Sequence, residues 1–446
     1  MRRLLGPVLC GVAALVGCCT MVAHDAAANP LDAFGFGARA IGLGGAATAS
    51  VDDFSANYYN PAALARLDGL RLELGYIAVK PSLSINGGDL GVDEPAGFQG
   101  GMTLPGKLLG RRLAFSVGIY LPDSRITRVR ALPQRQPRFA LYDNRPQRLV
   151  ITASGSVEVL DDLFLGFGLT FLSDTAGQVD IDGIVSASDV GDTELLSAIN
   201  VALPAVRYPS FGLLYAPGPW RFGLTWREEF SLSIDLAVAV RGDVVFGDQQ
   251  TVIAEDGSFS VRSVNTNLFS PRQIALGGAY EAERWMVSAD LTWLQWSQFP
   301  TPTSTVTVNL DVPGLPLEIP PSAVPEDPNF RDILVPRVGA EWVAVDGEQV
   351  GVTLRGGYFY EPTPAPDQRG ATNFVDNDKH GLSAGLGLRF SDWTEIFPRP
   401  IVLDLAVQYI VMPQRVYQKD DPADPVGDYT AQGHLLGGAL TCRFLF

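Results

Sequence analysis

Apolar and polar residues alternate with a period of two in windows that recur along this chain up to its last residue. In the window that begins at Leu113, Phe115 and Val117 lie on one face of an extended chain, and Ser116 and Gly118 lie on the other. One face suits lipid and the other suits a lumen, although the core of a soluble β-sandwich produces the same alternation. Beyond residue 28 no apolar run is long enough for a transmembrane helix. The pattern therefore predicts an all-β chain.

The connections between these windows favour a membrane barrel over a sandwich. There are about fourteen windows, an even number as bacterial barrels require. They lie near residues 70–80, 95–105, 112–121, 147–158, 163–172, 206–216, 220–240, 272–282, 285–296, 334–345, 350–360, 380–390, 401–411 and 433–446. Tight links (160–162, 217–219, 283–284, 346–349) alternate with long ones (122–146, 173–205, 297–333, 412–432). Short periplasmic turns and long outer loops explain this alternation, so we expect a transmembrane antiparallel β-barrel of about 14 strands.

The N-terminal residues have the pattern of a secretory signal peptide. Two arginines precede an apolar stretch over residues 4–23, and Ala26-Ala27-Ala28 forms a cleavage site of the A-x-A type. We therefore assign residues 1–28 to a signal peptide and expect the mature chain to begin at Asn29. A retained membrane anchor and lipoprotein processing at Cys18 are the alternatives.

Charge and composition exclude several classes of partner. With 33 Lys and Arg against 49 Asp and Glu, the chain is too acidic for nucleic acid to be an expected partner. After cleavage Cys442 is the one remaining cysteine, and His380 and His434 are the remaining histidines, so we expect no metal site and no cofactor. The acidic residues within 420–424 offer a loose Ca²⁺ site or, alternatively, a solvated loop.

The stretch before the first strand window has a different character. Residues 29–68 lack strand alternation and are rich in glycine and alanine, which allows compact packing inside a lumen. Within this stretch, Asn60-Pro61-Ala62 predicts a helix start. Asn60 would be the N-cap, and Pro61 would occupy the first helical position.

Several motifs resemble one family over nearly the whole mature chain. Residues 38–46 and 57–64 resemble the hatch of the outer-membrane long-chain fatty acid and aromatic hydrocarbon transporters of the FadL/TodX type. Residues 291–299 resemble the Trp-Ser-x-Phe strand end of that family, and residues 376–380 resemble its Asp-x-Asp-Arg block, with Lys379 where the family often has arginine. The terminal Phe446, with Phe444 on the same face, resembles the signal read by the barrel assembly machinery.

The resemblance implies a division into a signal peptide (1–28), an N-terminal hatch (29–68) and a transmembrane barrel (69–446). It implies an outer-membrane location in a Gram-negative bacterium and passive uptake of long-chain fatty acids or other hydrophobic small molecules, with lateral exit into the bilayer. Asn60, Pro61 and Ala62 carry the gating motif of the hatch. The alternative functions are a hydrocarbon or aromatic-compound channel, a general porin, a passive structural or adhesion barrel, and a surface lipid hydrolase.

Two groups in the expected outer loops are candidate ligand contacts. Arginines in an acidic chain suit phosphate and carboxylate, so the first loop is expected to bind lipopolysaccharide or fatty-acid headgroups, or else to be a plain solvated loop. Its principal candidates are Arg125, Arg128 and Arg130, followed by Arg135, Arg138 and Arg145. In the next long loop, an apolar stripe at helical spacing predicts a short amphipathic helix that captures ligand or packs on the barrel rim. Its residues are Leu195, Leu196, Ile199 and Leu203.

One motif suggests catalysis, but its context argues against an enzyme. Residues 381–385 match the nucleophile-elbow pattern around Ser383, and Asp404 and His434 follow in the order found in hydrolases. An elbow requires a strained turn into a helix, whereas Leu382 and Ala384 continue the alternation of a single strand. We therefore expect no catalytic residue and no enzyme activity.

Overall fold

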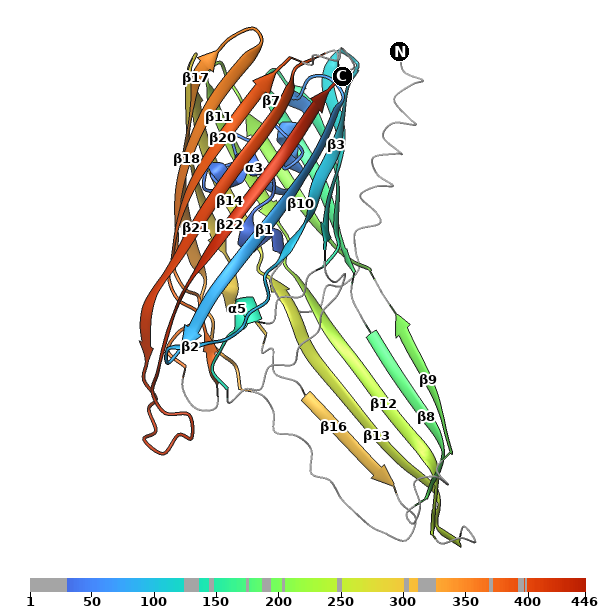
Figure 1. The fold of residues 1–446 in the computed structure, drawn as a ribbon. Helices are drawn as coiled ribbons and strands as arrows, with labels where there is room; N and C mark the ends of the chain where they lie inside the picture. The colour runs from blue at the N-terminus through green and yellow to red at the C-terminus, as the bar shows by residue number, and fades with distance from the viewer. Residues whose placement is uncertain are drawn as a thin grey trace.

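The alternating windows form the strands of an antiparallel barrel in the computed structural model (Figure 1). The structure describes residues 30–123, 136–143, 148–173, 176–186, 194–202, 205–246, 251–300, 305–311, 326–368, 372–391, 397 and 399–446. Among these residues no helix combines the length and apolar character needed to cross a membrane.

Fourteen described strands build the barrel wall, as predicted. They are β1 (Arg71–Ile85), β3 (Ala96–Leu108), β4 (Arg111–Pro122), β6 (Val150–Leu160), β7 (Leu163–Ser173), β10 (Ala205–Tyr215), β11 (Trp220–Arg227), β14 (Gln273–Glu281), β15 (Trp285–Leu294), β17 (Ile333–Asp346), β18 (Val350–Glu361), β20 (Lys379–Phe390), β21 (Ile401–Tyr417) and β22 (Tyr429–Leu445). Neighbours in the wall are neighbours along the chain, and β2 (Gly88–Asp89) only prolongs the β1 hairpin. Because β1 pairs with both β22 and β3, the ladder is closed.

Alternation along the strands separates lipid-facing from lumen-facing side chains, as the sequence predicted. In β4, Phe115 and Val117 are 58% and 47% exposed, whereas Ser116 between them is 3% exposed. The exposed face of the wall is therefore apolar, and the polar residues point inward.

One predicted boundary is wrong. The window 220–240 was expected to form a single wall strand, but β11 ends at Arg227 and the chain leaves the wall at Phe230. Glu228 and Glu229 lie at the break, where Arg272 Nη2 is 2.7 Å from Glu228 Oε1 and 3.8 Å from Glu229 Oε2. The acidic pair is thus neutralised at the rim instead of being placed in the wall.

A second sheet projects beyond the end of the barrel opposite the C-terminus (Figure 1). Its strands come from the long connections and have the order β16 (Thr305–Asp311), β13 (Thr251–Ser270), β12 (Phe230–Phe246), β8 (Ala176–Ser186) and β9 (Glu194–Ala202). This sheet corrects the prediction of an amphipathic helix at Leu195, Leu196 and Ile199, because these residues belong to β9. The backbone of β9 pairs with β8, and Ile199 lies opposite Val179. These hydrogen bonds between strands replace the hydrogen bonds that a helix would form within itself, so the predicted apolar face of a helix does not form.

Residues 30–68, which we call the lumen segment, lie inside the barrel (Figure 1). The segment contains α2 (Pro30–Phe34), α3 (Ala38–Gly42), α4 (Ala56–Tyr59) and the 3₁₀ helix η1 (Pro61–Arg66). α3 packs on β18, β20, β21 and β22, whereas η1 packs on β3, β4, β6, β7 and β10. The two halves of the segment therefore rest on different parts of the wall.

Glycines on the inner face of the wall let the backbone of the lumen segment approach the strand backbone directly. A Cβ added at Gly357 would lie 2.2 Å from Gly44 N, and one added at Gly166 would lie 2.3 Å from Ala62 N. Three more wall glycines have comparably close contacts with the segment: Gly212, Gly223 and Gly339. A side chain at any of these positions would displace the segment.

The outer end of the lumen is covered by two further stretches of chain. We call residues 138–143 and 372–377 the outer cover; they contain β5 (Arg138–Phe139), α5 (Ala140–Asp143) and β19 (Phe374–Val375). β5 and β19 pair in parallel, with Phe374 opposite Arg138 and Val375 opposite Phe139. Phe139, Phe374 and Val375 are buried, so the cover has a small apolar core of its own.

Alanine substitutions at two adjacent glycines of β18 test how the lumen segment packs against the wall. Gly357→Ala should weaken its seating by about 1–3 kcal/mol, because the added methyl collides with segment backbone. Gly356→Ala, on the outer face, meets no atom closer than 3.9 Å and is the matched control. In planar lipid bilayers we expect higher ion conductance for Gly357→Ala than for Gly356→Ala, with equal heat-modifiable mobility of both barrels. Equal conductance of the two variants would contradict this account of the packing.

Candidate ligand cavity

A cavity of about 100 Å³ lies between the lumen segment and the outer cover. Leu31 and Tyr58 of the segment border it on one side, and Leu141 and Tyr142 of the cover border it on the other. A cavity of roughly 150 Å³ is enough to bind benzene. At about 100 Å³ this cavity is smaller than that, so in this conformation it has room for only a few carbon atoms.

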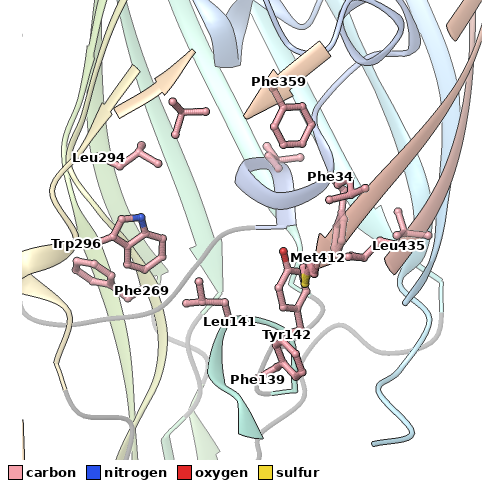
Figure 2. Packing of buried hydrophobic residues seen from close by; sticks show 14 of the residues in the cluster. Phe34, Phe139, Leu141, Tyr142, Phe269, Leu294, Trp296, Phe359, Met412 and Leu435 are labelled. Carbon is pink, nitrogen blue, oxygen red and sulfur yellow. The ribbon is translucent and has the colours of Figure 1, made fainter. Parts of the chain in front are cut away.

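The walls of the cavity are rich in apolar and aromatic side chains. Figure 2 shows Leu294 and Trp296 across from Phe34, with Leu141 and Tyr142 between them at the level of the outer cover. All five residues border the cavity. Such a lining with a few polar groups is typical of sites that bind hydrophobic small molecules.

Asp32 connects the start of the lumen segment to the wall. Its carboxylate accepts hydrogen bonds from Tyr58 Oη and Ser270 Oγ, from Arg227 Nη1 at 3.2 Å, and from Gln273 Nε2 at 3.0 Å. The Arg227 guanidinium also lies 3.8 Å from the centre of the Tyr58 ring. α2 is therefore fixed by a buried, charge-assisted network at the edge of the cavity.

Asn60 is fully buried and forms the N-cap that the sequence predicted. Its Oδ1 accepts a hydrogen bond from Ala62 N at 3.1 Å, at the start of η1. Its Nδ2 donates to Thr48 O at 2.8 Å and to Leu213 O of β10 at 3.1 Å. One side chain thus links η1, the preceding loop of the segment and the wall.

Pro61 and Ala62 rest directly on the wall beside Asn60. Ser156 Oγ donates to Ala62 O at 2.8 Å, and the space above Gly166 is filled by the Pro61-Ala62 peptide. The three residues of the predicted gating motif therefore belong to a single tightly packed contact with the wall.

An ionic network holds the other flank of the lumen segment. Arg39 Nε lies 3.0 Å from Glu341 Oε2 of β17, and Arg443 Nε lies 2.7 Å from Glu73 Oε1 of β1. Burial raises the pKa of the Asp53 carboxyl above its usual value, although Arg443, 3.6 Å away, acts in the opposite direction. The wall residues Arg355 and Asp404 complete this network.

Further buried ion pairs border the cavity itself. Lys379 Nζ lies 3.0 Å from Glu361 Oε1 and 2.8 Å from Asp376 Oδ2. Arg337 Nη2 lies 3.9 Å from Glu361 Oε2, and its guanidinium is 4.9 Å from the centre of the Phe359 ring. Glu361 therefore stands between the two cations.

The other predicted contact residues do not meet at this cavity. Arg125, Arg128 and Arg130 lie outside the described residues. Leu195, Leu196 and Ile199 lie in β9 of the projecting sheet. In the described part of the chain, no group of three or more His, Cys, Asp or Glu residues is arranged to hold a metal ion.

The nucleophile-elbow pattern has the strand context that the alternation predicted. β20 runs without interruption from Lys379 to Phe390, so the strained turn that an elbow requires is absent at Ser383. Ser383 Oγ accepts a hydrogen bond from Gln408 Nε2 at 3.0 Å, and Asp404 is paired with Arg355. These contacts give Ser383 and Asp404 structural partners in the lumen.

Sequence reasoning missed Asp32, Arg227 and Glu361, which shape the polar part of the cavity. Asp32 and Arg227 are 195 positions apart, and only the strand register brings them together. A usable signal was the placement of charged residues at lumen-facing positions of strands that are otherwise apolar or small. In a wall that lipid surrounds, such positions demand a partner inside the barrel.

Residues 17–444 match the family described as "Outer membrane protein transport protein (OMPP1/FadL/TodX)". Alkane uptake protein A of Marinobacter nauticus is 23% identical over 418 residues, which cover 88% of this chain and 86% of that protein.

Solved structures with the same fold include a Pseudomonas aeruginosa FadL homologue, with a TM-score of 0.58 and 17% identity over 92% of this chain and 98% of that one. The Pseudomonas putida toluene transporter TodX has a TM-score of 0.53 and 16% identity over 93% of this chain and 99% of that one. Since the family match extends from residue 17 to residue 444, this protein belongs to the OMPP1/FadL/TodX family of outer membrane transport proteins.

Proposed function

We propose that residues 29–68 act as a hatch that must shift before a hydrophobic molecule can pass through the barrel. The protein is an outer-membrane transporter of hydrophobic compounds in a Gram-negative bacterium. The observation that carries the proposal is the small cavity of about 100 Å³ between the lumen segment and the outer cover. A cargo longer than a few carbon atoms needs more space than this conformation provides.

The lumen segment is better suited to move than the wall. Every wall strand is paired on both sides, and separating two strands in lipid leaves backbone groups without partners at several kcal/mol each. Among the described residues, the segment has no strand pairing with the wall: it is held by packing against wall glycines and by separate side-chain hydrogen bonds, such as those of Asp32 and Asn60. A shift between two packed positions is a common way to gate a site.

Lateral exit into the bilayer suits an apolar cargo better than release into the periplasm. Transfer of apolar surface from water to an apolar medium is favourable by roughly 25 cal/mol per Å². Between the lumen segment and the wall lies the ionic network around Arg39 and Arg443. An uncharged, apolar molecule forms no favourable interactions with these charged groups.

The described relatives suggest two classes of cargo. One is named an alkane uptake protein, one a FadL homologue and one a toluene transporter. We propose hydrocarbons and long-chain fatty acids as the candidate cargoes. A general porin is the less favoured function, because the lumen is filled by the segment.

Two further roles follow from the sequence and remain proposals. We propose Phe446 as the residue that the barrel assembly machinery reads. The residue is 43% exposed, and the centre of its ring lies 5.6 Å from that of Phe397. We also propose that Arg125, Arg128 and Arg130 contact anionic headgroups at the outer surface.

The assigned signal peptide predicts that the mature protein begins near Asn29. We expect N-terminal sequencing of protein from the outer-membrane fraction to start there, and we expect the protein to migrate as a heat-modifiable barrel. A mature chain that begins at Cys18 would indicate lipoprotein processing instead.

Asn60→Ala should lower uptake per folded barrel while leaving barrel assembly unchanged. Loss of the cap costs about 1 kcal/mol locally, whereas the stability of the barrel comes from the strand ladder. A change of about 1 kcal/mol in the free-energy difference between two positions of the hatch alters the ratio of their populations about fivefold. Uptake of labelled decane and of a labelled fatty acid, normalised to heat-modifiable protein, measures the effect.

Asn60→Ser separates the two roles of this side chain. Serine retains a capping oxygen but loses the donors to Thr48 O and Leu213 O. We expect it to reduce uptake as Asn60→Ala does if the tie to the wall controls the gate. A normal rate per folded barrel in Asn60→Ala would assign this residue to the fold alone.

A further inference from the structure

The cavity lining contains equal numbers of acidic and basic side chains. Among the described residues that border it, the acids are Asp32, Asp290 and Glu361, and the bases are Arg227, Arg337 and Lys379. The cavity therefore has no excess of positive charge with which to attract an anionic cargo.

Each base is already matched with a carboxylate of the protein. Arg227 Nη1 lies 3.2 Å from Asp32 Oδ1. Lys379 is 3% exposed and lies between Glu361 and Asp376, while Arg337 lies between the other Glu361 oxygen and the Phe359 ring. The two oxygens of Glu361 thus occupy the positions that the carboxylate of a fatty acid would take beside Lys379 and Arg337.

Asp290, one of the three acids, has no basic partner of its own among the ion pairs just described. Its Oδ2 accepts a hydrogen bond from Thr48 N at 2.8 Å. Its Oδ1 is buried and has no hydrogen-bond partner among the described residues. Charges interact strongly in such a buried setting, so a ligand carboxylate near Asp290 and Glu361 would be repelled.

We propose that Glu361 is a built-in counter-ion that makes the cavity selective for uncharged hydrocarbons over fatty-acid carboxylates. This inference rests on the proposed function, because it assumes that cargo passes through the cavity. An ionised fatty acid would have to displace Glu361 from Lys379 and Arg337, which would leave a buried carboxylate without its partners. An alkane or a neutral ester leaves these ion pairs intact.

Competition between matched ligands tests the selectivity without any substitution. Cells that produce the protein take up labelled decane in the presence of unlabelled methyl decanoate or decanoate, at about pH 7.5, where a carboxyl group is ionised. We expect methyl decanoate to compete at a concentration about tenfold or more below that required for decanoate, because like charges in a buried site are costly. Equal competition by the ester and the carboxylate would overturn the proposal.

Glu361→Gln tests the residue itself. Removing its charge takes the Glu361 carboxylate away from Arg337 and leaves Lys379 with Asp376 alone. We therefore expect decanoate to compete at least about tenfold better than with the original protein. Asp367→Asn is the matched control, because Asp367 is exposed and pairs with Arg415 at 2.9 Å away from the cavity lining. An unchanged preference in a folded Glu361→Gln barrel would contradict the assignment.

The outcomes also separate this inference from the transport function. If cells take up neither decane nor decanoate faster than cells without the protein, the proposed function fails. If they take up decanoate as readily as decane, transport stands and the role of Glu361 is refuted. Should Glu361→Gln fail to form a heat-modifiable barrel, the ester and carboxylate comparison on the original protein still decides the selectivity.

Discussion

Both edges of β1 are hydrogen-bonded, to β22 on one side and to β3 on the other, and this closure sets the width of the lumen. A barrel of about eight strands is filled by its own side chains, whereas larger barrels leave open space. With fourteen wall strands, inward-pointing residues alone would leave a channel. The lumen segment fills that space.

The lumen segment is held by two unlike kinds of contact. Near Asn60 its backbone lies against wall glycines such as Gly166 and Gly212, where van der Waals contact and hydrogen bonds depend on close fit. Near Arg39 it is held by the ion pairs Arg39–Glu341 and Asp53–Arg443, which tolerate small displacements better because charges act over longer distances. Close fit therefore positions the segment on both flanks, since Gly357 and Gly339 lie against residues 43–44, and the ion pairs near Arg39 add to it.

Local sequence patterns predicted those features that depend on local chemistry. Period-two alternation located the wall strands, and the Asn-Pro-Ala motif located the N-cap at Asn60, because both signals act within a few residues. The segment 194–202 was misassigned because its apolar spacing fits a helix, whereas pairing with β8 and the parallel contact between β8 and β12 decide its structure. The cavity ion pairs could not be predicted, because they depend on strand register across the closed wall.

The seat of α3 also has a consequence for the order of assembly. Ala38 N donates to Thr441 Oγ1 of β22 at 3.2 Å, across 403 positions of the chain. Arg443, on the same strand, lies 3.6 Å from Asp53 Oδ2. The lumen segment therefore acquires the partners of Ala38 and Asp53 only when the last strand has been made. The segment can therefore complete its docking only when the wall closes, late in biogenesis. In an unfinished chain, the site to which the lumen segment docks is still incomplete.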